Sequence, residues 1–520
     1  MDEVVIDKKN CMFGLFQRYK TVILLTVLYW TVRLVNLPGL PIYNDEAIYL
    51  DWGWREIHIP GYLFYSLYDA KPPLLMWVFG IASSVLPDPL LAGRLVGVFF
   101  GYGTLLGIYS IGRRYFSQRV GILAGLCTIT NPLLSFFDRQ ALMESSLGAV
   151  GIWMLYAFLR YCDTKRLIWI VSIGTLLGLG FFIKTNALLF GIAFLMLSIG
   201  LLISHRLNIR QTAMLIGVVV LIFILLVIPL LLQPDFWKTF HTINRYSLTL
   251  SEIGTFPFHN WIQNFIRTSI ILLLHTTPFL FFAAGFGFLL LLFRNNISYR
   301  IIGLWFILCM GFVLLTARNV IERYVVSFIP LMGIFAAYQF DWCMRRARLF
   351  AVWTLGMSLL CMGIFTAFQI ASPVTYIRFF ASFSPVALRE YVFGVTSGIG
   401  IDEAVDYLRE QAGGEKTFVG FALNTGTPES AVIVKLLKDP SLTAGYLDAR
   451  YMNMDVAQYD CLVAPVPVYF VSREEEKAGL DKFLEKKRVI TNPYGGNTIG
   501  IYKLVRPCEG RTKTLHFETP

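Results

Sequence analysis

Residues 43–73 read YNDEAIYLDWGWREIHIPGYLFYSLYDAKPP, and this stretch decides how the rest of the chain is interpreted. It carries five acidic residues, a lysine and an arginine among many tyrosines and tryptophans, whereas long apolar runs lie around it. Acidic side chains beside a membrane are costly to desolvate, so the stretch is either a functional site or a solvated connector with aromatic residues at the membrane interface. The remaining sequence has to decide between these two readings.

Composition places the chain among membrane proteins. Of 520 residues 15% are charged, and the mean hydropathy is +0.60, which is typical of a helical protein with many spans. The net charge of +11 comes from Lys and Arg in short loops between apolar runs, a pattern that excludes nucleic acid as a partner. The eight cysteines form no CxxC motif and no zinc site; Cys461 and Cys508 could pair in an oxidising compartment.

Apolar runs of about 20 residues predict a mainly α, polytopic bundle of about eleven spans. The first run has no cleavage motif after it and is expected to remain as a span. A shorter run, Leu74–Leu86, is bounded by prolines and is expected to be a helix at the membrane interface. The spans are predicted near 21–38, 90–112, 119–137, 144–161, 167–183, 185–204, 211–232, 268–293, 301–316, 324–341 and 350–371.

The connecting loops predict the topology. Alternate loops carry most of the basic residues, such as Arg113 and Arg114, Arg206 and Arg345, and the positive-inside rule makes these loops cytoplasmic. The protein is expected in the plasma membrane, with its N-terminus in the cytoplasm. Since the number of spans is odd, the C-terminal part is expected outside, on the same face as residues 43–73.

A change of composition predicts a second domain. We expect a membrane module at 1–375 with an outer catalytic loop at 39–89, a linker at 376–399, a small extracytoplasmic α/β domain at 400–505 and a tail at 506–520. Charged helices are expected at 402–413 and 472–487, and strands at 417–423, 461–472 and 497–505. Between them, Thr427 is expected to cap a helix whose first residue is Pro428.

More charged residues share the predicted outer face with Asp45. They lie in three turns between spans: Asp138, Arg139 and Glu144; Lys184; and Arg318, Glu322, Arg323 and Tyr324. Each residue also has an explanation without function, because charged side chains at helix ends often lie at the membrane interface or extend toward it. Together, however, acids and cations at one face suit a chemistry in which a carboxylate takes the proton of a hydroxyl and cations hold a phosphate leaving group.

The same residues carry a resemblance. Asn44-Asp45-Glu46-Ala47-x-Tyr49, Asp69-Ala70-Lys71-Pro72-Pro73-Leu74, Ala92-Gly93-Arg94-Leu95, Arg139-Gln140-Ala141-Leu142-Met143-Glu144, Gly178–Lys184 and Glu322-Arg323-Tyr324 with Pro330 follow one another in this order. This order resembles the GT-C glycosyltransferases of the protein O-mannosyltransferase and lipid A aminoarabinose transferase type. Departures from the family pattern are Glu144, Asp69 and the Thr185-Asn186 pair after Lys184, which leave the acceptor and any metal undecided.

The resemblance implies an inverting transfer of a sugar from a polyprenyl-phosphate carrier to a hydroxyl of a protein, glycan or lipid on the outer face. Asp45, followed by Glu46, would form the catalytic pair, with Asp45 as base or as the carboxylate that orients the acceptor. Lys71, Arg323 and Lys184 would bind the donor phosphate. Supporting positions would be Tyr49, Asp69, Arg139, Glu144 and Tyr324.

No cofactor is required by this chemistry, and whether a divalent metal takes part is unknown from the sequence. Two rival functions remain. A transporter or flippase of lipid-linked sugars would use the same cations without needing Asp45 as a base, but it predicts charges deep within several spans. A non-catalytic receptor would leave the shared placement of Asp45, Lys71 and Arg323 unexplained.

Overall fold

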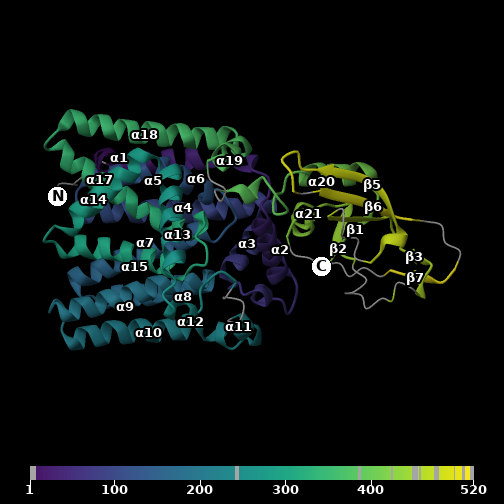
Figure 1. Ribbon diagram of the computed structural model, residues 1–520, viewed down its shortest axis with the longest axis horizontal. Coiled ribbons are helices and arrows are strands. Elements are labelled where there is room, and N and C mark those ends of the chain that lie inside the picture. The colour runs from purple at the N-terminus through teal and green to yellow at the C-terminus, as the bar shows by residue number, and fades with distance from the viewer. Residues whose placement is uncertain are drawn as a thin grey trace, which may run out of the picture.

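The computed structural model describes residues 8–239, 245–383, 388–422, 426–447, 455, 458–473, 479–496, 498–505 and 510–515. Long helices run side by side to form a bundle, and a smaller domain with a β-sheet lies beyond one end of it (Figure 1). The expected fold class, a mainly helical membrane protein with a small C-terminal α/β region, is confirmed.

The helices of the bundle are long and mostly apolar, and side-chain caps fix several of their starts: Asp88 accepts hydrogen bonds from the first turn of α4, and Asn296 from that of α15. In chain order the helices are α1 (Lys8–Leu34), α2 (Asn44–His58), α3 (Leu74–Val85), α4 (Pro89–Tyr115), α5 (Gln118–Thr130), α6 (Pro132–Asp138), α7 (Glu144–Thr164), α8 (Leu167–Ile183), α9 (Leu188–Ile203), α10 (Ile209–Leu231), α11 (Pro234–Thr239), α12 (Leu250–Gly254), α13 (Phe258–His275), α14 (Pro278–Leu292), α15 (Ile297–Thr316), α16 (Glu322–Val325), α17 (Ile329–Met344), α18 (Arg348–Ala371) and α19 (Pro373–Ala381).

Each of the eleven expected spans falls on a helix or on a pair of helices. Within the described residues, seven helices are long and apolar enough to cross a membrane, or nine if two bent pairs each count as one. The other two expected spans are α7, which is mostly buried, and α8, which has only 17 residues. The expected short helix after Pro73 is α3.

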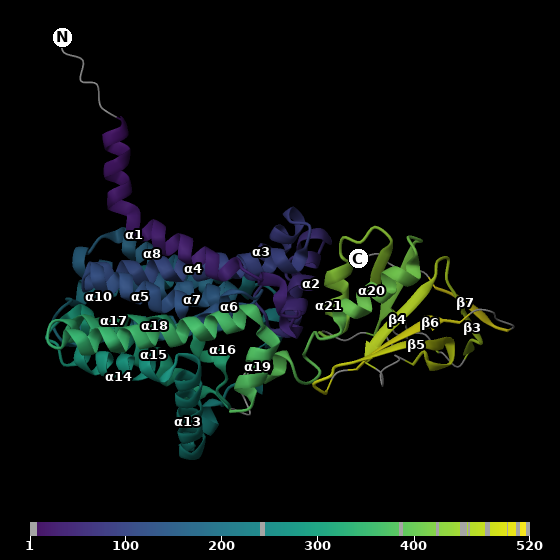
Figure 2. The ribbon, with the colours of Figure 1, turned by 90° about the horizontal axis from the view of Figure 1, so that it is seen from above.

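Two expected spans are bent in the structure: residues 119–137 are divided into α5 and α6, which meet at 66°, and the bend within 268–293 is sharper. Residues 268–293 were predicted as a single span, but α13 and α14 meet at a bend of 120°. Figure 2 shows α13 running across the direction of the long helices. Thr276, Thr277 and Pro278 explain the break, because Thr277 has φ +68 and proline starts a new helix. The hydropathy of the run does not reveal this break.

The acid-rich stretch forms α2 at the end of the bundle that faces the sheet domain, and α3 follows directly after the stretch (Figure 1). Here α2 crosses α3 at very short range: a Cβ on Gly80 would lie 2.1 Å from the carbonyl oxygen of Gly53. Glycine at both positions therefore allows backbone contact between the helices. This crossing and the buried side chains of Trp52, Met76 and Phe79 give α2 a firm support.

The C-terminal domain contains a five-stranded mixed sheet in the order β2-β1-β4-β6-β5. The pairs β1–β2 and β1–β4 are parallel, and β4–β6 and β5–β6 are antiparallel. A separate parallel pair joins β3 to β7. The elements are α20 (Ile401–Ala412), β1 (Thr417–Phe421), α21 (Glu429–Leu436), β2 (Leu442–Tyr446), β3 (Cys461–Val463), β4 (Val468–Arg473), β5 (Leu484–Thr491), β6 (Thr498–Leu504) and β7 (Thr512–Thr514).

Several local expectations differ from the structure. The helix predicted at 472–487 is absent from its described residues: the chain forms a short 3-10 turn at Asp481–Phe483 and then β5, because pairing with β6 overrides the helical preference of Glu and Lys. The expected tail contains β7, and α19 runs from the end of the expected membrane module into the expected linker. Cys508 and its proposed pairing with Cys461 lie outside the described residues.

Thr427 does not cap α21. The helix begins at Glu429 with Pro428 before it, and no side chain caps its first turn. The amide and hydroxyl of Thr427 instead donate to the side-chain oxygen of Asn44 at the start of α2, at 2.8 and 3.1 Å. A contact between residues this far apart in sequence replaces the local cap that the turn pattern indicated.

Candidate functional site

The first turn of α2 is fixed by Glu46. Its carboxylate accepts two hydrogen bonds from Arg94 of α4, at 3.0 and 2.9 Å, and one from the amide of Ala141. It also accepts from the amide of Tyr43, which closes the start of the helix. Glu46, predicted as a catalytic acid, is fully buried, and all of these hydrogen bonds hold it at the start of α2.

Asp45, one residue earlier, faces a different set of partners. Its carboxylate accepts a 2.5 Å hydrogen bond from Nη1 of Arg323, which lies at the start of α16. The same guanidinium donates through Nε to Glu144 at 3.1 Å, and Lys184 donates to that carboxylate at 2.9 Å. The result is a continuous chain of ion pairs, Asp45–Arg323–Glu144–Lys184, that we call the charge chain.

The charge chain joins four segments that are far apart in sequence. Asp45 comes from α2, Glu144 from the start of α7, Lys184 from the turn after α8 and Arg323 from α16. Glu144 is completely enclosed, whereas Asp45 keeps a quarter of its side chain exposed (25%). Asp45 is therefore the carboxylate of this chain that an incoming molecule can reach.

Three more predicted residues border the charge chain. Lys71 follows a tight turn in which Ala70 adopts φ +66, and its ammonium interacts electrostatically with Asp45 and Lys184. The Lys71 Nζ lies 6.0 Å from the ring centre of Tyr246. Tyr49, one turn along α2 from Asp45, is buried beside Arg323, and Tyr324 is half-buried next to it.

The charges around Asp45 keep it ionised. Burial alone raises the pKa of Asp45, but the Arg323 guanidinium, Lys71 and a hydrogen bond from Asn44 together hold that pKa below its ordinary value. In the charge chain and Lys71, three cations face two carboxylates, so one positive charge remains. This surplus favours an anionic ligand next to an ionised Asp45.

The segment predicted as a linker also contributes to the site, a contribution that sequence reasoning missed. The ring of Tyr391 lies 4.1 Å from that of Tyr43, and Glu390 accepts a hydrogen bond from the Tyr43 hydroxyl. Burial raises the pKa of Glu390. The only signal in the sequence was an acid between Arg389 and Tyr391, which gives no indication of a neighbour 347 residues earlier in the chain.

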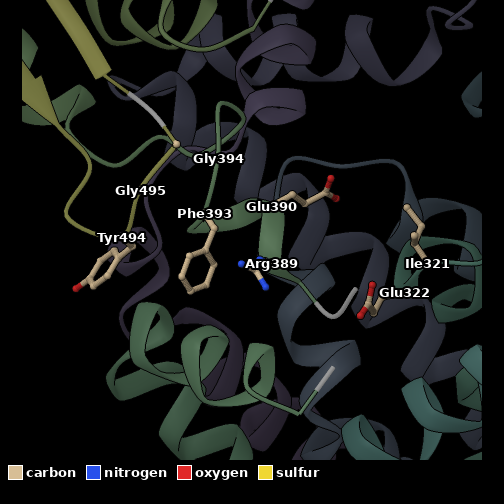
Figure 3. Close-up of a pocket in the computed structure, with 9 residues that line it drawn as sticks. Ile321, Glu322, Arg389, Glu390, Phe393, Gly394, Tyr494 and Gly495 are labelled. Atoms are coloured by element: carbon tan, nitrogen blue, oxygen red, sulfur yellow. The ribbon is translucent and has the colours of Figure 1, made fainter. Parts of the chain in front are cut away.

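A cavity of about 600 Å³ opens where this segment meets the C-terminal domain. Figure 3 shows acidic and aromatic side chains around it, with the glycines of two turns forming part of the wall. Glu390 connects the cavity to the charge chain, since it interacts with Arg323 and Asp45. The lining residues are Ile321, Glu322, Arg389, Glu390, Phe393, Gly394, Tyr494, Gly495 and Gly496.

Other charged residues predicted at the outer face have partners outside the charge chain. Arg139 donates to the carbonyl of Asn36 at 2.6 Å, and Asp138 pairs with Arg33 at 3.0 Å within the bundle. Arg318 holds Glu252 with two hydrogen bonds. Asp69 is half-buried, and the structure shows no ion pair or hydrogen bond from it to the charge chain within the described residues. Arg139 and Asp69 are therefore not brought to the charge chain.

A metal site was left undecided by the sequence. In the part of the chain that the structure describes, no group of three or more His, Cys, Asp and Glu side chains is arranged to hold a metal ion.

Comparisons with known proteins agree with this architecture. Residues 70–232 match the family model of dolichyl-phosphate-mannose-protein mannosyltransferases. The fold is similar to that of ArnT from Cupriavidus metallidurans bound to undecaprenyl phosphate, with a TM-score of 0.56 and 16% identity over 93% of this chain and 98% of that one. A search of curated protein sequences gives no match.

A second similar structure is the archaeal oligosaccharyltransferase AglB from Archaeoglobus fulgidus in complex with an inhibitory peptide and a dolichol-phosphate. Its TM-score is 0.52 at 12% identity, with 81% of this chain and 64% of that chain covered. The family match and the two folds confirm the resemblance to GT-C glycosyltransferases that the motifs indicated. They support a multi-pass membrane protein with this fold.

Proposed function

We propose that this GT-C-like membrane protein transfers a sugar from a polyprenyl-phosphate carrier to an acceptor hydroxyl on the outer face of the plasma membrane, with inversion at the anomeric carbon. The charge chain together with Lys71 is the observation that carries the proposal, because it sets a reachable, ionised carboxylate beside three cations. An acceptor hydroxyl needs a carboxylate that takes its proton, and a departing phosphate needs cations that bind it.

In this mechanism Lys71, Arg323 and Lys184 hold the donor phosphate. Arg323 is suited to the task because its planar guanidinium has donors enough for a carboxylate and a phosphate at once. Glu144 is enclosed and binds both Arg323 and Lys184, so it fixes where these two cations stand. No protein nucleophile is invoked: the acceptor oxygen attacks the anomeric carbon directly and the carrier phosphate leaves.

Asp45 accepts the hydroxyl proton during the attack. In the free protein Arg323 is its principal stabilising partner. A bound phosphate shares this guanidinium and brings negative charge, and both effects raise the pKa of Asp45 toward that of a useful base. Donor binding thereby prepares the base, which disfavours proton removal from the acceptor before a donor is in place.

The acceptor is proposed to enter through the 600 Å³ cavity, since Glu390 links its wall to Asp45 and Arg323. Carboxylates, exposed glycine backbone and two aromatic rings suit a polar, hydroxyl-bearing molecule. The lipid tail of the donor would lie among the bundle helices, whose outward-facing side chains are apolar.

The test uses purified protein in lipid with a set of radiolabelled polyprenyl-phosphate sugars, and it measures release of the lipid phosphate. Asp45→Asn is expected to lower turnover roughly 10²–10⁴-fold while donor binding persists. Asp406→Asn, an exposed carboxylate on α20, is the matched control and should keep normal turnover. Full turnover in Asp45→Asn overturns the proposal; donor that crosses the bilayer unchanged in both proteins indicates a flippase instead.

A further inference from the structure

Asn44 lies between the C-terminal domain and Asp45. As the first residue of α2 it accepts hydrogen bonds from the amide and hydroxyl of Thr427, at 2.8 and 3.1 Å. On its other side, its Nδ2 donates to Oδ1 of Asp45 at 3.4 Å. One side-chain amide thus connects a turn of the C-terminal domain to the proposed base.

This network fixes the orientation of the Asn44 amide. The oxygen has to face Thr427, because the Thr427 amide can only donate. The NH₂ group is consequently directed at Asp45, where it stabilises the carboxylate on the oxygen opposite to the one that Arg323 holds. The backbone amide of Asn44 donates to the carbonyl of Thr396 at 3.1 Å, which holds the residue in place.

The turn that carries Thr427 is shaped for this contact. Gly426 has φ +129, and a Cβ there would lie 2.1 Å from the Asn44 oxygen, so the close approach requires glycine. The Thr427 carbonyl accepts from Arg473 at the end of β4, at 3.1 and 3.3 Å, which ties the turn to the central sheet. Thr427 itself is fully buried.

We infer that Asn44 is a positioning residue through which the docked C-terminal domain orients Asp45 and stabilises its carboxylate for transfer. This inference rests on the proposed function, in which Asp45 takes the acceptor proton. It assigns the C-terminal domain a part in catalysis: the domain sets the geometry of the base.

The test measures kcat, KM for donor and the acid limb of kcat/KM in the full-length protein in lipid. Asn44→Ala removes a hydrogen bond that favours ionised Asp45, so the limb should move to higher pH, by about 0.5–1 unit, and kcat should fall roughly tenfold. Donor KM should change less than twofold, because the three cations are untouched.

Variants on the C-terminal domain make the test specific. Gly426→Ala pushes against the Asn44 oxygen and should give the same shift of the acid limb, although residue 426 belongs to the other domain. Thr427→Val, which loses the hydroxyl donor, should shift the acid limb less than Asn44→Ala does. Thr427→Ser keeps the hydroxyl and should leave the limb at its wild-type position. Lys438→Met removes a different contact between the domains, to the carbonyl of Leu86, and should leave the limb in place.

An unshifted acid limb in both Asn44→Ala and Gly426→Ala, with activity lost only in proportion to folded protein, would mean that Asn44 serves docking alone. Melting temperatures of each variant measure that folded fraction. If instead Asp45→Asn keeps full turnover, the proposed function itself fails. The two failures are therefore distinguishable.

Discussion

Asp45 and Glu46 leave α2 about 100° apart, because consecutive residues on an α-helix are separated by that angle. Asp45 consequently faces the charge chain, and Glu46 faces Arg94 in the interior. Removing one partner of such a buried pair typically costs about 3–5 kcal/mol, since it leaves a charge uncompensated. Glu46 thus holds the helix start in place, and the partly exposed Asp45 is the carboxylate to which the proposed function gives the chemistry.

Glu56, on the same helix, provides a prediction about pH. It is buried, accepts a hydrogen bond from the amide of Ser66, and burial raises its pKa to about 8. The folded protein therefore holds a proton that the unfolded chain releases near pH 4.5, and stability falls as the pH rises up to 8. Between pH 6 and pH 8 the loss amounts to roughly 2–3 kcal/mol.

Glu56→Gln should abolish this part of the pH dependence while its amide oxygen still accepts from Ser66. Thermal unfolding in detergent at pH 6 and pH 8.5 measures it: the wild type should lose several degrees more than the variant. Glu403→Gln, an exposed acid on α20, is the control. Equal losses in the wild type and Glu56→Gln would contradict the raised pKa.

At this scale the sequence predicted the members of the charge chain well, because charged residues at the ends of apolar runs are conspicuous. It could not separate Asp45 from Glu46, since the direction of a side chain depends on where the helix starts. Arg139 was misplaced for the same reason. Glu390 was missed because nothing in residues 376–399 indicated that they fold back onto Tyr43.

At the scale of elements, α13 turns its polar face to the protein and leaves its apolar face exposed. Asn260 and Asn264 donate to the carbonyl of Ala317, and Arg267 donates to Asn319, so the polar side contacts protein. The opposite side leaves Phe258, Ile262 and Phe265 exposed at 63%, 58% and 62%. An apolar face on a helix that runs across the spans suits the interface region of a bilayer.

Probes on α13 should therefore report one shallow depth. Bimane labels at positions 258, 262 and 265 are expected to be quenched by lipids brominated near the headgroup, all to a similar degree. Labels at 282, 286 and 289 on α14 are the control and should become progressively deeper, by about 1.5 Å per residue. A steady change of depth along α13 would mean that it spans the membrane after all.

Elements of regular hydropathy were predicted well, and those decided by tertiary contacts were not. The apolar runs gave the long helices, because about 20 apolar residues have few alternatives in a membrane. The bend at Thr277 and strand β5 escaped prediction. The first depends on one residue with φ +68, and the second on pairing with β6.

At the scale of the whole molecule, the charged groups separate to two ends. The ring of Phe116 just after α4 stacks on Tyr299 near the start of α15, with 4.4 Å between the ring centres. This contact brings the end of α4, which carries Arg114, to the first turn of α15, which carries Arg300. The charge chain and the C-terminal domain lie together elsewhere, joined by Asn44 and Thr427. This separation is what the positive-inside rule requires of a protein with its C-terminal domain outside.

Labelling of single cysteines in intact cells tests that orientation. A cysteine at position 410 on α20 should react with a membrane-impermeant maleimide, whereas one at 206, between α9 and α10, should react only after the membrane is opened. A melting temperature close to that of the wild type shows that each variant is folded. Reaction of both positions from the same side would refute the proposed topology.

The contact between Asn44 and Thr427 also has a consequence for biogenesis. The two residues are 383 positions apart, so a ribosome makes the start of α2 long before the turn that completes its surroundings. A nascent or truncated chain that has inserted its first spans still lacks this contact. The orientation that this contact gives to Asp45 is therefore set only once the last-made domain has folded.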